Sequence, residues 1–240
     1  MKLSSVHSWH YQLQGTVDPE ISADCFVIDI DADPTPLLRP DRIVLAYFSV
    51  GEAEDYRAYW PEAEDIVLGE NPEWTGNYPV RFWSYEWNRI VQTRVREARK
   101  KGFNGLYLDK VDVVDDIARR WPRLAREVSL YPEMSVLISR IVGTAPELLI
   151  VLQNGEDLIA EVGTSWCIDG LAKEELLFQD GKRNPPDEVR ETLTKLRLSN
   201  VPVLCVEYLD DPAQRQTAID WFDARGLPLF LSSGDRELAG

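Results

Sequence analysis

The sequence contains few of the residues on which metal and redox chemistry most often depends. Its 240 residues include two histidines, His7 and His10, and three cysteines, Cys25, Cys167 and Cys205. Both histidines lie near the N-terminus, which argues against a zinc site and against a Ser-His-Asp triad. Each cysteine lies in an apolar run, which favours a buried free thiol, with a disulfide or a metal site as the alternatives.

Positive charge and long apolar runs are also scarce. The chain has 26 Lys and Arg against 41 Asp and Glu, for a formal net charge of -15. A nucleic-acid-binding protein needs a basic surface, so no nucleic-acid partner is expected, whereas a cationic partner is compatible with the charge. No stretch approaches the roughly 20 apolar residues of a membrane span. The N-terminal segment lacks the apolar core of a signal peptide, so the sequence leaves the cellular location undetermined.

Glycine-rich nucleotide motifs are missing as well. Neither G-x-x-x-x-G-K-[ST] nor G-x-G-x-x-G occurs, and no D-x-D-x-D-G loop specifies a calcium site. We therefore expect no cofactor. The chain also shows no internal repeat, low-complexity tract or linker, which predicts a single domain over residues 1–240.

Short apolar runs alternate with longer amphipathic segments along most of the chain. Several of the short runs are apolar on both faces, as in a parallel sheet that is covered by helices. The expected strands are Phe26–Ile30, Ile43–Val50, Val80–Trp83, Gly105–Asp109, Leu148–Asn154, Trp166–Glu174, Val203–Tyr208 and Leu229–Ser232. The expected helices are Glu86–Lys101 before Gly102, Asp115–Val142 with a break at Pro122 or Pro132, Pro185–Leu198, and one that Asp211 caps and Pro212 begins.

Eight strands with intervening helices predict an α/β fold, a (β/α)8 barrel of the TIM type, with a doubly wound open sheet as the alternative. The first and last helices should be degenerate, because Pro34, Pro36 and Pro40 interrupt the first and seven residues follow Ser233. Residues 1–20 are expected to form an N-terminal extension that packs on the barrel, with Trp9–Gln14 covering a gap. We expect a monomer.

Acidic side chains end several of the expected strands. In such a barrel the reactive groups lie at the C-terminal ends of the strands, so these carboxylates should share one rim. Asp109 is the strongest candidate, since alternation places it with Tyr107 on the face opposite Leu106 and Leu108. Asp112 has a simpler alternative role as a helix cap.

Two carboxylates that face each other across a barrel mouth are what glycoside hydrolysis requires. One protonates the leaving oxygen while the other attacks the anomeric carbon or activates water. Binding of a divalent metal ion, with metal-assisted hydrolysis, is the rival use of clustered acids.

Several sequence blocks resemble the endo-α-1,4-polygalactosaminidase family of glycoside hydrolases, family 114, and its bacterial relatives with a (β/α)8 fold. The blocks are WHYQLQG at 9–15, FVIDID at 26–31, VLAYFSVGEAEDYRAYW at 44–60, NPEWTGNYPVRFW at 71–83, GFNGLYLDKVD at 102–112, QNG at 153–155 and DGLAKEELLF at 169–178. The resemblance implies endo-hydrolysis of α-1,4-linked galactosamine polymers. It also implies secretion or a periplasmic location if a signal segment has been removed.

The resemblance implies a catalytic pair of Asp109, as nucleophile, and Glu174, as general acid and base. Glu175 is adjacent and would be reached by a shift of one residue. The remaining matched positions would contact the sugars, with aromatic rings against pyranose faces and carboxylates against the amines of a cationic amino sugar. They are Asp29, Tyr47, Ser49, Glu54, Trp74, Asp112 and Asn154, and two further residues of the predicted rim, Tyr107 and Glu207, are expected to contact the sugar as well. A barrel that binds amino-sugar glycans without cleaving them is the alternative function.

Overall fold

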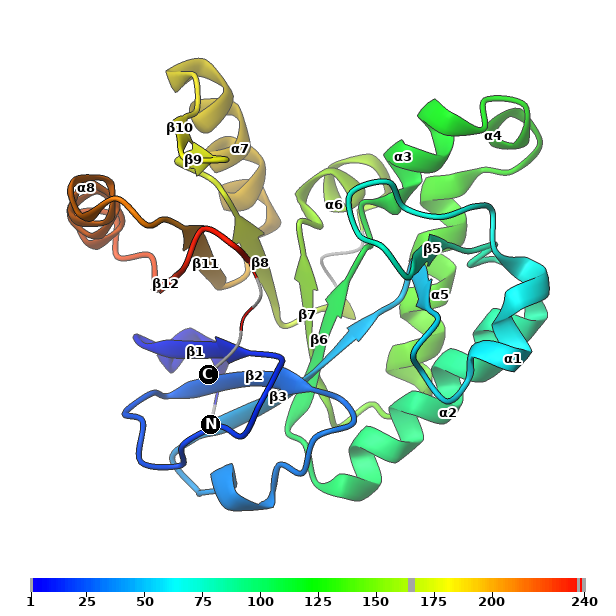
Figure 1. Cartoon of the computed structure of the whole chain (residues 1–240), viewed down its shortest axis with the longest axis horizontal. Helices are drawn as coiled ribbons and strands as arrows, with labels where there is room; N and C mark the ends of the chain where they lie inside the picture. The colour runs from blue at the N-terminus through cyan, green and yellow to red at the C-terminus, as the bar shows by residue number, and fades with distance from the viewer. Residues whose placement is uncertain (1, 164–166, 237, 239–240) are drawn as a thin grey trace.

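The computed structural model describes residues 2–163, 167–236 and 238, and its centre is an eight-stranded sheet that curves into a barrel (Figure 1). Adjacent strands are parallel and follow the order β1-β2-β3-β6-β7-β8-β11-β12. Their bounds are β1 Trp9–Gln12, β2 Cys25–Asp29, β3 Ile43–Ser49, β6 Gly105–Asp109, β7 Leu149–Gln153, β8 Gly170–Glu174, β11 Val203–Tyr208 and β12 Leu229–Ser232. The predicted (β/α)8 barrel is confirmed.

Helices surround the barrel and connect most of its strands (Figure 1). They are α1 Trp60–Ala63, α2 Tyr85–Lys101, α3 Val113–Arg120, α4 Leu124–Glu127, α5 Leu130–Thr144, α6 Glu156–Val162, α7 Pro186–Ser199 and α8 Pro212–Asp223. Three short 3-10 turns, η1 Leu3–Ser5, η2 Thr35–Leu37 and η3 Glu64–Ile66, complete the helical elements of the described residues. The expected loss of the first and last helices is seen, since η2 alone joins β2 to β3 and no helix follows β12 in the described part of the chain.

The helix boundaries follow the local signals in the sequence. Ser84 caps α2 by accepting a hydrogen bond from the Trp87 backbone N–H at 3.1 Å, and Gly102 ends this helix with φ of 92°. The long helical pattern after Asp112 breaks around Pro122, between α3 and α4. Pro132 lies in the first turn of α5, where its missing N–H has no intrahelical acceptor to lose.

One strand of the barrel differs from the prediction. The first strand is Trp9–Gln12, which pairs with β2, so this segment belongs to the barrel and does not lie on top of it. Val80–Trp83 is not a barrel strand, because its apolar side chains pack in the long connection between β3 and α2. That connection contains a small antiparallel pair, β4 (Glu52–Glu54) and β5 (Asn77–Pro79). A second small pair, β9 (Phe178–Gln179) and β10 (Lys182–Arg183), follows β8.

Apolar residues form two layers, as strand alternation requires. Residues that face inward, such as Val27, Leu45 and Tyr107, fill the barrel, while their neighbours Phe26 and Leu106 pack against the helices. The three cysteines are buried and form no disulfide among the described residues, as predicted. The expected strand from Trp166 starts outside the described residues, and β8 begins at Gly170. None of the described helices has the length and hydropathy of a membrane span.

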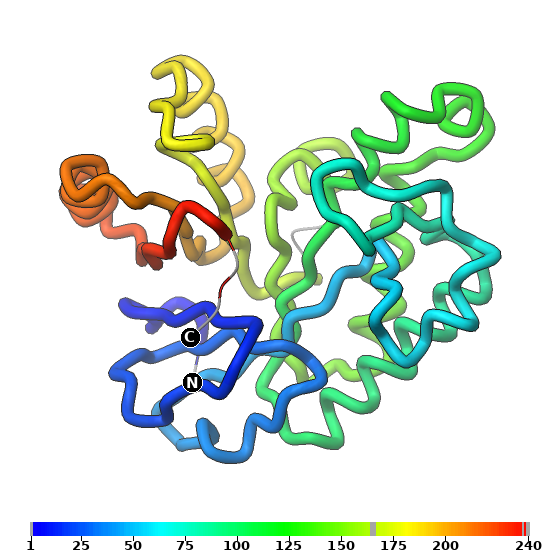
Figure 2. Tube along the Cα trace, in the orientation of Figure 1, coloured from blue at the N-terminus to red at the C-terminus, as the bar shows by residue number. Residues whose placement is uncertain are grey.

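Aromatic side chains join the two ends of the sheet. The Phe230 ring of β12 lies 5.6 Å from the Trp9 ring and 5.3 Å from the His10 ring of β1, between centroids. The segment after β12 then runs beside β1 (Figure 2), where the backbone N–H of Leu13 donates to the Leu238 carbonyl at 2.9 Å. Ring packing and this tail therefore close the barrel at its β12–β1 junction.

Candidate active site

A cavity of about 660 Å³ opens at the C-terminal ends of the barrel strands. Parallel strands deliver their last side chains to this rim, so residues that are far apart in the sequence meet here. Nine of the eleven predicted site residues line it: Asp29, Tyr47, Ser49, Glu54, Trp74, Asp109, Asp112, Asn154 and Glu174.

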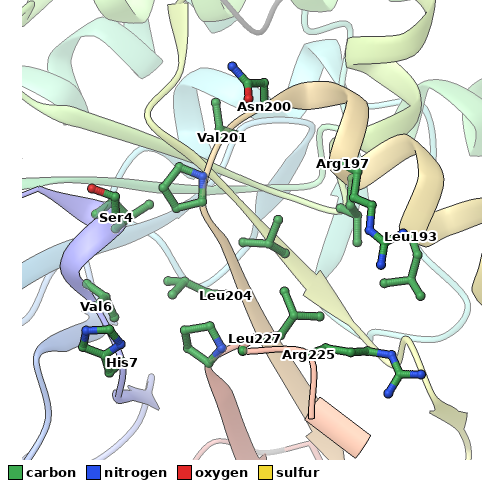
Figure 3. A pocket seen from close by; sticks show the side chains of 16 residues that line it. Ser4, Val6, His7, Leu193, Arg197, Asn200, Val201, Leu204, Arg225 and Leu227 are labelled. Carbon is green, nitrogen blue, oxygen red and sulfur yellow. The ribbon is translucent and has the colours of Figure 1, made fainter. Parts of the chain in front are cut away.

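A second cavity of about 490 Å³ lies at the opposite end, where β11 and β12 begin (Figure 3). Its wall is largely aliphatic, with Val6, Leu193, Leu204 and Leu227 among its residues. None of the described residues that line it is acidic. The carboxylate chemistry therefore belongs to the C-terminal rim.

Asp109 ends β6 with a carboxylate that is held by two donors. The Tyr47 hydroxyl donates to Oδ2 at 2.6 Å, and the backbone N–H of Lys110 donates to Oδ1 at 2.6 Å. Tyr47 comes from β3, the strand beside β6, so the sheet itself sets this contact. Asp109 is 7% exposed, which leaves it open toward the cavity while the protein fixes its position.

Glu174 ends β8 and is held from both neighbouring strands. Its Oε2 accepts hydrogen bonds from Gln153 Nε2 at 2.5 Å and from Asn154 Nδ2 at 3.2 Å, both at the end of β7. Its Oε1 accepts a hydrogen bond from the Tyr208 hydroxyl of β11. Each predicted catalytic carboxylate thus receives a phenol hydroxyl from an adjacent strand.

The electrostatic environment of Glu174 favours its protonated form. Burial, followed by the negative charge of Asp109, raises the pKa of Glu174 above its usual value. Burial, followed by the charge of the carboxylate that each contacts, also raises the pKa of Tyr47 and of Tyr208, so both phenols remain donors. A carboxyl group whose pKa is raised toward neutrality can hold a proton and release it, as a general acid must.

The backbone turns sharply just after three adjacent strands. Lys110, Asn154 and Glu175 follow β6, β7 and β8 and have φ of 60°, 51° and 50°. Left-handed conformations of residues other than glycine cost energy and concentrate at functional sites. Here each of them directly follows a barrel strand and lines the cavity.

An arginine that sequence reasoning missed occupies one wall of the cavity. Arg57 is 7% exposed and binds both carboxylate oxygens of Asp29, at 2.8 and 2.6 Å. It also binds Glu54 at 2.8 Å and Asp31 at 2.8 Å. Asp29 and Glu54 are therefore committed to a buried ion-pair network, which orders the wall instead of leaving two free carboxylates for a sugar amine.

Two other acids at the rim, Asp112 and Glu73, have no such partner among the described residues. Asp112 occupies the N-cap position of α3, yet its carboxylate caps none of the described N–H groups of that helix. Asp112 reaches solvent, but the protein around its carboxyl group disfavours the charged form, and the negative charge of Asp109 adds to this effect. Together they raise the pKa of Asp112 to about 7. Glu73 and Asp112 form no ion pair with a described residue. Trp74, which also lines the cavity, is 38% exposed.

Two predicted sugar contacts, Tyr107 and Glu207, do not reach the cavity and are corrected. Tyr107 is fully buried one layer below the rim, with its ring centroid 5.2 Å from that of Tyr11. Glu207 is also fully buried, because it points outward from β11 and accepts hydrogen bonds from the backbone N–H groups of Leu177 at 2.6 Å and Phe178 at 3.1 Å. It holds the chain that follows β8.

The role of Glu207 predicts a pH-dependent stability. Burial raises the pKa of Glu207 from its ordinary 4.5 to about 7. Between these pH values the unfolded chain releases this proton and the folded protein keeps it, so the free energy of unfolding falls as the pH rises from 4.5 to 7. The loss is expected to be about 3 kcal/mol, to be measured by urea unfolding across this range.

The Glu207→Gln variant should lack the share of this decrease that Glu207 contributes, while the share from Glu174 and Asp112, whose pKa values are also raised, should remain. The slope with pH is the readout, because an amide oxygen can accept from the two N–H groups less well and the absolute stability will change as well. The exposed Glu188→Gln variant on α7 is the control and should keep the wild-type slope. An unchanged slope in Glu207→Gln would contradict the assignment.

Several cavity residues were not among the predicted sites. Tyr11 lies at the end of β1 and donates to Gln153 Oε1 at 3.2 Å, and recognition of Trp9–Gln12 as a strand would have found it. Arg236 follows β12 and binds Glu175 at 2.6 Å and Asp180 at 2.8 Å. The described residues include no group of three or more His, Cys, Asp or Glu side chains arranged to hold a metal ion.

Comparisons with known proteins identify relatives of this chain. A protein from Methanocaldococcus jannaschii is 30% identical, over 96% of this chain and 76% of that protein. A protein from Deinococcus radiodurans is 29% identical, over 98% of this chain and 82% of that protein. The chain is thus related along nearly its whole length to proteins from distant organisms.

Two solved structures have the same fold. Aspergillus fumigatus Ega3, in complex with galactosamine, has a TM-score of 0.78 at 19% identity, over 97% of this chain and 93% of that chain. The glycoside hydrolase domain of PelA from Pseudomonas aeruginosa has a TM-score of 0.78 at 20% identity, over 97% and 95%. The model of glycoside-hydrolase family GH114 matches residues 2–235. The chain therefore belongs to glycoside-hydrolase family GH114.

Proposed function

We propose that this glycoside hydrolase cleaves α-1,4-linked galactosamine-containing polysaccharide at internal bonds, with Asp109 as nucleophile and Glu174 as general acid and base. The observation that carries the proposal is the placement of both carboxylates in one cavity at the C-terminal rim, each fixed by neighbouring strands. Glu174, whose pKa is raised, protonates the leaving oxygen, and Asp109 attacks the anomeric carbon. Glu174 then removes a proton from the water that releases the product.

The surroundings of Glu175 support Glu174 as the acid. Glu175 is paired with Arg236, and a guanidinium cation stabilises a carboxylate in its charged form. Glu174 has neutral donors on both oxygens and Asp109 nearby. A general acid must hold a proton and then release it, and the environment of Glu174 favours this more than that of Glu175 does.

The charge of the cavity supports a cationic sugar. Eight acidic side chains line it, against three basic ones, Arg57, Lys110 and Arg236. Since Arg57 engages Asp29 and Glu54, the acids available to a protonated amine are Asp112 and Glu73, and Trp74 lines the same cavity. A protonated sugar amine bound there would exchange part of its hydration shell for an ion pair with Asp112 or Glu73.

The test compares chain cleavage of α-1,4-linked polygalactosamine in its deacetylated and fully N-acetylated forms. We expect shorter products from the deacetylated polymer, at a kcat/KM that is roughly tenfold higher than for the acetylated polymer at low salt, and a smaller ratio at high salt. Products are measured by mass spectrometry. Binding by calorimetry without shorter products would favour the glycan-binding alternative, and loss of cleavage with a chelator would favour metal-assisted hydrolysis.

A further inference from the structure

A line of polar side chains runs from Glu174 to the outside of the barrel. Asn154 donates from Nδ2 to Glu174 Oε2, and its Oδ1 accepts from Lys173 Nζ at 3.2 Å. Lys173 in turn binds Glu156 Oε1 at 2.7 Å. Lys173 precedes Glu174 on β8, so alternation points the two side chains to opposite faces of the sheet.

The contacts of Asn154 determine which way its amide faces. Its Oδ1 accepts from two groups, Lys173 Nζ and the backbone N–H of Glu174, each at 3.2 Å. An ammonium group and a backbone N–H can donate but cannot accept. If the amide were turned over, its NH2 group would face both donors. The amide is therefore held with its NH2 group toward Glu174.

This orientation distinguishes the two oxygens of Glu174. Oε2 faces amide N–H groups from both Gln153 and Asn154, so a proton on this oxygen would confront two donors. Oε1 faces the Tyr208 hydroxyl, which can either donate or accept. The transferable proton of Glu174 therefore belongs on Oε1.

Lys173 is itself held by a buried acid. Glu156 is the first residue of α6 and is 6% exposed, and the side chain of Lys173 is 19% exposed. Glu156 Oε2 has no hydrogen-bond partner among the described residues, so the ion pair with Lys173 is the contact that compensates this buried carboxylate. Such a pair positions the ammonium group more firmly than a surface pair would.

We propose that Lys173, anchored by Glu156, is a positioning residue that locks the Asn154 amide as a donor to Glu174 Oε2 and so directs the catalytic proton to Oε1. This inference rests on the proposed role of Glu174, but its structural part, the lock on Asn154, is testable without turnover. Lys173 itself reaches Glu174 through Asn154 and does not contact the reacting atoms.

The experiment follows the titration of Glu174 by NMR of the side-chain carboxyl carbon in Glu156→Gln/Lys173→Met. This double substitution removes one charge of each sign and avoids leaving Glu156 buried without a partner. Without Lys173, the backbone N–H of Glu174 alone still holds Asn154 Oδ1, so the amide turns more freely and donates less to the carboxylate. The titration midpoint of Glu174 should therefore rise by about one pH unit. The other groups that face Glu174 remain in place: Asp109, Lys110, Asp112, Tyr11, Tyr47, Tyr107, Tyr208 and Arg236.

The matched control removes a different ion pair from the same helix. Asp157, the next residue of α6, binds Lys195 at 2.8 Å, and neither residue contacts Asn154. Asp157→Asn/Lys195→Met should keep the wild-type midpoint. The conservative Lys173→Arg variant retains a cationic donor toward Asn154 and Glu156 and should restore most of the wild-type value.

A third comparison distinguishes an effect of Lys173 that acts through Asn154 from a direct electrostatic effect of Lys173 on Glu174. In an Asn154→Ala background, Glu156→Gln/Lys173→Met should produce no further rise, because the group through which Lys173 acts is gone. The same rise in that background, or a midpoint within about 0.2 pH units of wild type in the double variant, would overturn the proposal. Glycoside cleavage is scored separately, so a shifted Glu174 in a protein that cleaves no polymer would refute the proposed substrate and leave the lock established.

Discussion

Substitution of Asp109 by asparagine is expected to lower kcat on the polymer by about 10⁴-fold. A neutral amide cannot attack the anomeric carbon or balance the positive charge that develops there. The amide has nearly the shape of the carboxylate and can still accept from the Tyr47 hydroxyl, so the fold and KM should change little. The measurement is steady-state cleavage together with thermal unfolding of the same preparation.

The same variant has a second, independent consequence. The charge of Asp109 is, after burial, the main cause that raises the pKa of Glu174. The pKa of Glu174 should therefore be lower in the Asp109→Asn variant. Asp115 on α3 also accepts a tyrosine hydroxyl, from Tyr131 at 2.8 Å, and lies outside the cavity. Asp115→Asn is therefore the matched control and should retain wild-type turnover. Wild-type turnover in Asp109→Asn would refute its role as nucleophile.

The Glu174→Gln variant should lose about 10²- to 10⁴-fold in kcat on the polymer, because the amide has no proton to give to the leaving oxygen. On an aryl galactosaminide with an acidic phenol as the leaving group, the loss should be much smaller, since that phenol departs without protonation. In the wild type, activity should fall as the pH rises through the elevated pKa of Glu174, because the acid form is then depleted. This alkaline limb should disappear in the variant.

Glu175→Gln distinguishes the two adjacent acids. It removes the Arg236 ion pair and should affect KM more than kcat, with the same loss on both kinds of substrate. If instead Glu175→Gln showed the dependence on the leaving group and Glu174→Gln did not, the roles of the two residues would be exchanged. Because Asp109 is proposed as nucleophile, the reaction should retain the anomeric configuration with the two carboxyl groups about 5–5.5 Å apart, and an inverted product would refute this role.

Periodicity predicted most of the barrel from sequence. Seven of its strands coincide with apolar runs, both ends of α2 follow their caps, and α8 begins after its Asp211 cap. The error at Val80–Trp83 has a physical cause, because a buried loop needs apolar residues as much as a strand does. Phe82 is fully buried in such a loop. Trp9–Gln12 was harder to recognise, since four residues with two polar side chains carry a weak pattern.

The rule that reactive groups lie at the C-terminal ends of the strands also predicted the two candidate carboxylates, since Asp109 and Glu174 are the last residues of β6 and β8. Glu207 shows what that rule omits. On β11, Val206 and Tyr208 face into the barrel, so alternation alone would have turned Glu207 outward. Tyr107 shares a face with Asp109 but lies one layer deeper, and depth along a strand depends on how the barrel is filled.

Arg57 could not have been assigned from sequence. Its partner Asp29 is 28 residues away, and the pairing depends on how the loop after β3 folds across the rim. Without that contact the acids at the rim look equally available to a ligand. The sequence therefore overestimated how many of them a sugar amine can use.

The division between strand ends and loops has an evolutionary consequence. The proposed reacting groups, Asp109 and Glu174, are set by the rigid sheet, whereas Glu73, Trp74 and Asp112 lie on connections outside it. Substitutions in those connections can alter which sugar is recognised while the hydrolytic chemistry is inherited unchanged. Members of one family can thus come to act on different polysaccharides while they keep the same catalytic reaction.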